Sequence, residues 1–243
     1  MKRPLVLVFG VSSYLLGVSA LVGWILIMLG FLRFDMSPVK IDSVLVQVIF
    51  GFVLTLLFGV QHSVMARAPF KEWISKLLPS QAERSMYVLA TALVLWPILY
   101  FWPENANVVW SVEKGALYTA IWCFGIFGWA YLFIASFAIN HFELFGLEQV
   151  YKYFKSVNSE PVPFKERLMY KFDRHPIMTG ALIGMWATPV MRMDHLIFAA
   201  LFTMYIVVGV SVEERDLIRQ WGQNYLDYAK RVKTIVPRIK FKG

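Results

Sequence analysis

The stretch ALYTAIWCFGIFGWAYLFIASFAI, residues Ala116–Ile139, contains no charged side chain. A helix of this length rises about 36 Å at 1.5 Å per residue, and about 20 apolar residues are enough to cross the hydrocarbon core of a bilayer. The stretch therefore predicts a membrane-spanning helix, and the rest of the chain is interpreted outward from it.

The composition of the whole chain carries the same signal. Its 243 residues are 58% hydrophobic and 16% charged, and the mean hydropathy is +0.56. A soluble domain has roughly 25% charged residues, so this chain has too few to cover a water-facing surface. Its 20 Phe, 9 Trp and 11 Tyr are residues that anchor helices at lipid interfaces. The sequence predicts an all-α polytopic integral membrane helix bundle.

Apolar runs predict about six transmembrane helices. They cover residues 5–32, 44–60, 86–102, 116–139, 177–191 and 196–212. The fifth run is short, so it tilts, enters part of the bilayer or extends through polar neighbours. We expect one membrane domain over 1–243. Within it, 1–145 hold helices one to four and the substrate side, and 146–243 hold the cofactor-binding part with helices five and six and an amphipathic tail.

The positive charges predict the orientation of these helices. Twenty of the 24 Lys and Arg residues fall in the two terminal segments and the second and fourth connections, and the four others are Arg33, Lys40, Lys114 and Arg192. Cytoplasmic loops carry the excess of such residues, so both termini are expected in the cytoplasm. The net charge of +8 is explained by this topology and not by a nucleic-acid partner. A bacterial inner membrane is the expected location.

The densest group of polar residues lies in YKFDRHPIMTG, residues 170–180. Proline disfavours a helical residue before it and suits the first helical turn, so His175 is expected at the cap of the fifth helix. Backbone N–H groups at such an end suit a carboxylate or another anion. Gly180 and Gly184 would allow a close approach on one helix face. The alternative is a capped helix start with a small-residue packing face.

Two adjacent carboxylates, Glu213 and Glu214, follow the last apolar run, at a depth where desolvation is expensive. An ion cluster with Arg174 or Arg215 is the structural interpretation, and a carboxylate facing a cationic or hydroxyl-rich ligand is the functional one. Leu217, Trp221, Tyr225 and Tyr228 then recur at helical spacing. This pattern predicts an amphipathic helix, whose apolar stripe packs against the core or against the membrane surface.

Four short motifs near the C-terminus occur in a definite order. They are Arg174-His175-Pro176 with Gly180, Glu213-Glu214-x-x-Leu217, Gly222-x-x-Tyr225-x-x-Tyr228 and Pro237. This arrangement resembles the C-terminal signature of a membrane methyltransferase superfamily. Its members include isoprenylcysteine carboxyl methyltransferases and phospholipid methyltransferases, which use S-adenosyl-L-methionine. The resemblance implies the same cofactor here.

Motifs in the rest of the chain narrow the resemblance. They are Gln61-His62-Ser63-Val64-Met65-Ala66-Arg67, Glu83-Arg84-Ser85-x-Tyr87, Asn140-His141-Phe142-Glu143-Leu144-Phe145-Gly146-Leu147, Trp186-Ala187-Thr188-Pro189 and His195-Leu196. Together they resemble the methanethiol S-methyltransferase branch, which makes dimethyl sulfide. Membrane proteins associated with nitrite reduction share the His62 segment. A larger lipid-like acceptor and a non-catalytic role related to those accessory proteins are therefore the alternatives.

The resemblance also implies which residues bind the cofactor. Positions matching the superfamily motif are Tyr170, Arg174, His175, Pro176, Met178, Glu213, Glu214 and Tyr225. Met178 departs from the aromatic residue common at its place, which puts that one contact in question. Adaptable apolar packing by methionine would preserve the pocket.

Methyl transfer to a thiol needs a proton acceptor, because a thiolate is the nucleophile and an alkyl thiol is mostly protonated at neutral pH. His62 and His141 each lie near a predicted helix end on the side of His175. We expect one of them to orient or deprotonate the thiol, supported by Tyr87 and Glu143. The alternative is an interfacial or capping histidine. A metal is not expected, because no pair of histidines has the i, i+4 spacing of a helical zinc site.

Overall fold

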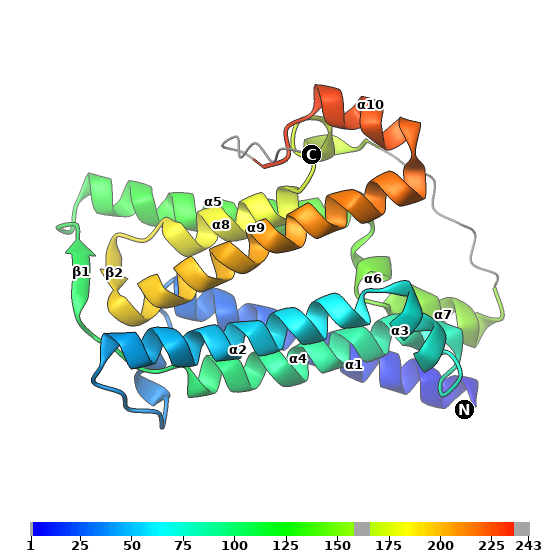
Figure 1. The fold of residues 1–243 in the computed structure, drawn as a ribbon, viewed down its shortest axis with the longest axis horizontal. Coiled ribbons are helices and arrows are strands. Elements are labelled where there is room, and N and C mark those ends of the chain that lie inside the picture. Colours follow the sequence, from blue (N-terminus) through cyan, green and yellow to red (C-terminus); the bar gives the residue numbers. More distant parts are fainter. Residues whose placement is uncertain (1, 158–165, 236–243) are drawn as a thin grey trace. The chain divides into compact units, whose positions relative to one another are not determined.

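The computed structural model describes residues 2–157 and 166–235, and within them the chain is almost entirely helical (Figure 1). The elements in order are α1 (Arg3–Met28), η1 (Phe34–Met36), α2 (Val44–Met65), α3 (Ala68–Ile74), η2 (Ser80–Ala82), α4 (Glu83–Phe101), β1 (Val108–Ser111), α5 (Ala116–Ile139), α6 (His141–Leu144), α7 (Leu147–Lys155), η3 (Leu168–Lys171), α8 (Pro176–Trp186), β2 (Val190–Arg192), α9 (Met193–Trp221) and α10 (Gln223–Arg231).

Five helices of the described chain are long and apolar enough to cross a membrane, and they are α1, α2, α4, α5 and α9. The predicted class, an all-α membrane bundle, is thereby confirmed. The fifth predicted crossing, 177–191, differs, because α8 has 11 residues. At 1.5 Å per residue it is about 16 Å long, roughly half of a hydrocarbon core. The helix ends at Trp186, and Pro189 disfavours a helical conformation at Thr188, so the helix does not reach spanning length.

The chain forms two compact units, which are described separately. Unit 1 holds α1 to α4 with η1 and η2, and also α6 and α7; unit 2 holds β1, α5, η3, α8, β2, α9 and α10. These units do not follow the expected division at residues 145 and 146, because α5 belongs to unit 2 and α7 to unit 1. The single membrane domain stays a prediction.

In unit 1, α4 packs against both α1 and α2 (Figure 1). Apolar side chains of α1 and α2 that face away from these contacts are exposed, among them Val8 and Leu45 at 62% and 69%. Exposure of this kind suits a lipid-facing surface. The loop after α5 returns through α6 to α7, which packs on α1. This arrangement puts the end of α2, the start of α4 and α6 into one neighbourhood of unit 1.

In unit 2, α8 packs closely on α5 through small residues. A Cβ atom at Gly180 would lie 2.6 Å from the Gly128 carbonyl oxygen, and one at Gly184 would meet the indole ring of Trp129. Contacts this close exclude any side chain larger than hydrogen. The predicted close approach at Gly180 and Gly184 is therefore confirmed, and its partner is another helix of the chain.

Strands β1 and β2 pair antiparallel and mark one end of unit 2 (Figure 1). Because β1 precedes α5 and β2 joins α8 to α9, the starts of α5 and α9 lie at this end. The interval 192–195 between the last two predicted runs is not a loop, since α9 already begins at Met193 and residues 187–192 contain the turn and β2. His175, at the start of α8, lies toward the opposite end of the unit.

The last predicted span is longer in the structure than its apolar run. Helix α9 continues nine residues past Val212, through both glutamates, to Trp221. It stops at Gly222, whose φ of 55° is a left-handed conformation that favours glycine. The predicted amphipathic tail is thus two helices, with Leu217 and Trp221 on α9 and Tyr225 and Tyr228 on α10, and their side chains pack into one cluster.

Candidate active site

Glu214 is the centre of the polar cluster in unit 2. Arg174 binds its carboxylate through two parallel hydrogen bonds, Nε to Oε1 at 2.9 Å and Nη2 to Oε2 at 2.8 Å. The hydroxyl of Tyr225 donates to Oε1 at 2.7 Å. Arg174 also donates from Nη1 to the carbonyls of Ala229 and Val232. The guanidinium thus joins the start of α8 to the end of α9 and to α10, as the structural interpretation of these charges predicts.

His175 lies between the two glutamates. It is 5% exposed, its Nε2 is 2.6 Å from Oε1 of Glu214, and its Nδ1 is 3.4 Å from Oε2 of Glu213. Burial disfavours the charged ring, but the hydrogen bonds and charges of the two carboxylates outweigh it and raise the pKa of His175 to about 9. At neutral pH the ring is a buried imidazolium.

The two adjacent glutamates differ sharply in their surroundings. The Glu213 side chain is 50% exposed and the Glu214 side chain 15%. Four hydrogen bonds occupy the Glu214 carboxylate, two from Arg174 and one each from His175 and Tyr225. Glu213 therefore retains the capacity to accept further hydrogen bonds from a ligand.

Segment 168–173 supplies groups that support His175. Asp173 is fully buried, and its Oδ1 accepts the backbone N–H of His175 at 3.0 Å. Burial raises the pKa of Asp173. The carbonyl of Tyr170 accepts the Tyr228 hydroxyl at 2.6 Å, and burial together with nearby Glu213 raises the pKa of the Tyr170 phenol. These contacts fix the backbone on which His175 stands.

The structure brings together most of the residues expected to bind a cofactor. Tyr170, Arg174, His175, Glu213, Glu214 and Tyr225 lie in one cluster. Pro176, which is buried, and Met178 form the first turn of α8, and His175 holds the expected N-cap position. Pro237 lies outside the described residues.

In unit 1, His62 forms a pair with Tyr87. The Tyr87 hydroxyl lies 2.5 Å from Nε2 of His62, and Thr91 Oγ1 lies 3.3 Å from its Nδ1. Because the Thr91 hydroxyl donates to the Tyr87 carbonyl, its oxygen accepts from Nδ1–H. Nε2 then carries the lone pair that accepts the Tyr87 proton. His62 lies in the last turn of α2, inside the helix and not after it.

His141 is buried at 3% exposure, and its Nε2 lies 3.1 Å from the Tyr14 hydroxyl of α1. Its ring is 4.7 Å from that of Phe145. Burial lowers the pKa of His141, so the ring is neutral at pH 7. Glu143 was expected to support one of the two histidines. Within the described chain its carboxylate accepts a hydrogen bond from Asn140 at 3.2 Å and bonds neither histidine.

Sequence reasoning missed three members of these clusters. Asp173 sat inside the quoted motif, and a carboxylate two residues before a helical cap could have identified it as the acceptor of the cap N–H. Tyr14 and Thr91 lie in apolar runs that offer no such signal, so only the packing of α1 and α4 reveals them. In the described part of the chain no group of three or more His, Cys, Asp or Glu is placed to hold a metal.

These features define a class: a helical membrane protein with a charged cluster at one end of its helices. The chain belongs to the methanethiol S-methyltransferase family. It is 40% identical over 238 residues to methanethiol S-methyltransferase 1 of Bradyrhizobium diazoefficiens, a match covering 95% of this chain and 84% of that protein. It is 38% identical over 242 residues to the methanethiol S-methyltransferase of Mycobacterium tuberculosis, covering 98% of each.

The resemblance found from the motifs is thereby confirmed. The chain is also 31% identical over 191 residues to nurim of Bos taurus, covering 75% of this chain and 72% of that protein. No protein-family model matches the chain, and no solved structure matches it.

Proposed function

We propose that this protein methylates methanethiol to dimethyl sulfide, with S-adenosyl-L-methionine as the methyl donor. The observation that carries the proposal is the match over 95% of the chain to a relative named for this acceptor. When bound, S-adenosyl-L-methionine supplies an electrophilic methyl carbon on a sulfonium. Transfer of that methyl group to the thiol sulfur would break its bond to the sulfonium and would give dimethyl sulfide, S-adenosylhomocysteine and the thiol proton.

The charged cluster of unit 2 fits this methyl donor. The half-exposed carboxylate of Glu213 is suited to accept hydrogen bonds from ribose hydroxyls or an amino group. The buried imidazolium of His175 holds that carboxylate in place. We assign direct contact to Tyr170, His175, Pro176, Met178 and Glu213.

The remaining residues of the cluster have a supporting role in this proposal. The carboxylate of Glu214 is filled by partners within the protein, and the guanidinium of Arg174 also bonds backbone carbonyls. Arg174, Glu214 and Tyr225 are therefore positioning residues, which hold His175 in its charged form and orientation.

For the thiol, we assign proton removal to the pair of Tyr87 and His62. In this assignment the phenolic oxygen takes the thiol proton while its own proton moves to Nε2 of His62, 2.5 Å away. Neutral, buried His141 is the alternative acceptor, with Tyr14 in the corresponding place. Thiolate and sulfonium neutralise each other in the transition state, so surroundings with little water favour the step.

One assay tests the function. The purified protein in detergent receives S-adenosyl-L-methionine and methanethiol, and dimethyl sulfide is measured in the headspace against a heat-inactivated sample. Dimethyl sulfide formation that depends on both reactants supports the proposal. Methyl transfer to a long-chain or isoprenyl thiol with none to methanethiol would favour the lipid-like acceptor. Absence of cofactor binding by calorimetry would favour a non-catalytic role.

We further propose that the protein lies in a bacterial inner membrane with both termini in the cytoplasm. The distribution of Lys and Arg supports this orientation. The polar cluster also supports it, because the cytosol supplies S-adenosyl-L-methionine and the cluster follows the apolar part of α9 on the side of the C-terminus.

A further inference from the structure

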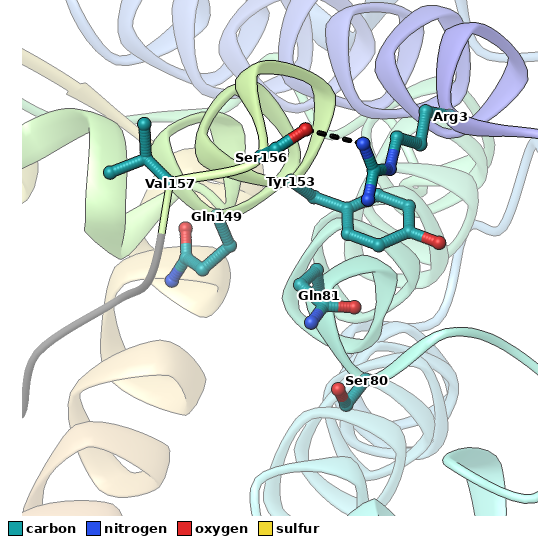
Figure 2. A pocket seen from close by; sticks show the side chains of 7 residues that line it. All are labelled: Arg3, Ser80, Gln81, Gln149, Tyr153, Ser156 and Val157. Atoms are coloured by element: carbon teal, nitrogen blue, oxygen red, sulfur yellow. Dashed lines mark hydrogen bonds between the residues drawn. The ribbon is translucent and has the colours of Figure 1, made fainter.

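A cavity of about 580 Å³ lies in unit 1, and its described lining includes no residue assigned to the reaction (Figure 2). The start of α1, η2 and the end of α7 surround it. Its lining residues are Arg3, Ser80, Gln81, Gln149, Tyr153, Ser156 and Val157.

The three segments around this cavity are held together by tight packing. Each segment or its flank contributes one residue to a fully buried cluster, which consists of Val6, Ala82 and Val150. A Cβ atom at Gly10 would collide with the side chain of Val150, so α1 and α7 approach as closely as backbones allow. The cavity walls are therefore built by the core of unit 1 and not by loose surface loops.

Among the described residues, the lining is rich in hydrogen-bond donors and contains no carboxylate. Arg3 donates from Nη1 to the Ser156 hydroxyl, as Figure 2 shows, and its guanidinium lies 5.5 Å from the centroid of the Tyr153 ring. Among the described residues Arg3 has no acidic partner. A guanidinium with several free N–H groups, surrounded by hydroxyl and amide groups, is suited to a phosphate.

Gln149 adds an acceptor to this set of donors. Its Nε2 donates to the Glu143 carbonyl at 3.0 Å, which fixes the orientation of the amide. Its Oε1 is buried and has no hydrogen-bond partner in the described part of the chain. A buried carbonyl oxygen without a hydrogen-bond partner is energetically unfavourable. A ligand with an O–H or N–H group of its own would satisfy this oxygen.

The cavity also lies at the depth of lipid headgroups. Arg3 is the first residue of a 26-residue spanning helix, and such a helix, about 39 Å long, places its first residue at the membrane surface. Just inside that position Leu5 and Val8 are 57% and 62% exposed, a surface for acyl chains.

From this cavity we propose a binding site for a phosphodiester lipid headgroup that carries its own hydrogen-bond donors, such as phosphoglycerol or phosphoethanolamine. The phosphate bonds Arg3 and the neighbouring hydroxyls, and the headgroup donor bonds Oε1 of Gln149. The site is independent of the proposed reaction, so its test does not rest on the enzyme assay.

The test uses native mass spectrometry of the full chain with phosphatidylglycerol, phosphatidylethanolamine and phosphatidylcholine of identical acyl chains. The first two should bind about tenfold more tightly, because choline has no donor for Gln149; tenfold corresponds to about 1.4 kcal/mol, within the range for a buried group left without its hydrogen bond. Gln149→Leu should remove this preference. Arg3→Gln should weaken all three lipids by about tenfold, whereas Lys2→Gln, which removes the same charge one residue outside the cavity, should have little effect.

Two outcomes would overturn the proposal. Equal binding of the three lipids by the unchanged protein would exclude a headgroup site with this acceptor. Equal weakening by Lys2→Gln and Arg3→Gln would mean that diffuse charge attracts the lipids. Inorganic phosphate and glycerophosphoglycerol are added in separate samples. If either displaces phosphatidylglycerol at an equal concentration, the phosphate chemistry holds but its source is soluble and not a lipid.

Discussion

At the scale of single residues, Glu213 and Glu214 show how little adjacency says about role. Successive residues of a helix point about 100° apart, so one carboxylate faces Arg174 and the other is half exposed. The sequence predicted both alternatives, an ion cluster and a ligand-facing carboxylate. The structure contains both groups, one on each residue, because α9 continues as a helix through them.

Substitution of the two glutamates should separate stability from binding. Glu214→Ala leaves the guanidinium of Arg174 without its carboxylate and should lower the free energy of unfolding by about 3 kcal/mol, the usual loss for a broken buried pair. Glu213→Ala removes one of the two carboxylates that raise the pKa of His175, so it should lower the melting temperature less than Glu214→Ala does, and it should weaken S-adenosyl-L-methionine binding. Thermal melts and calorimetry in detergent measure both. Unchanged cofactor affinity in a folded Glu213→Ala protein would remove this residue from the site.

The imidazolium of His175 should make stability depend on pH. Its pKa is about 9 in the folded protein, against about 6.5 in the unfolded chain. Because the folded pKa is the higher one, the stabilisation is complete below about pH 6.5 and is lost as pH rises through about 9, a change on the order of 3 kcal/mol. Melts between pH 6.5 and 10 should show this decline in the unchanged protein and a flatter profile in His175→Gln. Parallel profiles for the two proteins would contradict a charged His175.

Removal of the base should leave a characteristic pH signature. His62→Ala should lower turnover by about 10²–10⁴-fold while cofactor affinity stays nearly intact, and higher pH should partly restore the rate as solvent supplies thiolate. His141→Ala is the matched variant for the alternative base. The measurement is the pH–rate profile of each variant beside the unchanged protein. A histidine with a structural role would instead reduce folded yield and cofactor binding together, without rescue.

At the scale of helices and strands, prediction succeeded where hydropathy alone sets the boundaries. Residues 116–139 match α5 because Glu113, Lys114 and Gly115 precede the apolar run. The polar pair Asn140 and His141 follows it. Prediction failed where packing sets the helix boundaries. Helix α9 continues through Glu213 and Glu214 because Arg174 and His175 neutralise these carboxylates. The conformation of Gly222 and the pairing of β1 with β2 depend on contacts distant in sequence, which no local pattern contains.

The interface of α5 and α8 should not tolerate any added side chain. Gly184→Ala would place a methyl group against the ring of Trp129, so we expect a loss of about 1–3 kcal/mol from overpacking. Gly209→Ala is the control: a Cβ there meets no described atom within 4 Å, and the same exchange in an exposed helix stabilises by up to about 1 kcal/mol. Thermal melts in detergent compare the two. Equal effects would mean that the close packing does not limit stability.

At the scale of the whole molecule, hydropathy and charge could predict the membrane class, and motif order could predict the family. They could not predict that the chain forms two units whose boundaries ignore sequence order. Helices α6 and α7 follow α5 in the sequence but belong to unit 1, because α7 packs against α1.

The orientation of the molecule is testable at its two ends. Both termini are expected in the cytoplasm, because 20 of the 24 Lys and Arg residues fall in the segments that the predicted topology places on the side of the termini. Cytoplasm-active and periplasm-active reporters are fused to each end in turn. The two ends should give the same cytoplasmic signal. A periplasmic signal at the C-terminal fusion alone would mean an odd number of crossings.

The brevity of α8 has a consequence for the choice of membrane. Beyond its 11 residues the chain turns into β2, whose N–H and C=O groups are paired with β1 beside Trp110. Peptide groups of an open two-stranded ribbon have unpaired edges that hydrocarbon does not solvate. A thicker bilayer would submerge this ribbon, whereas the 29-residue α9 could compensate by tilting. Hydrophobic mismatch should therefore act on the ribbon first, and short-chain lipids should suit this protein better than long-chain ones.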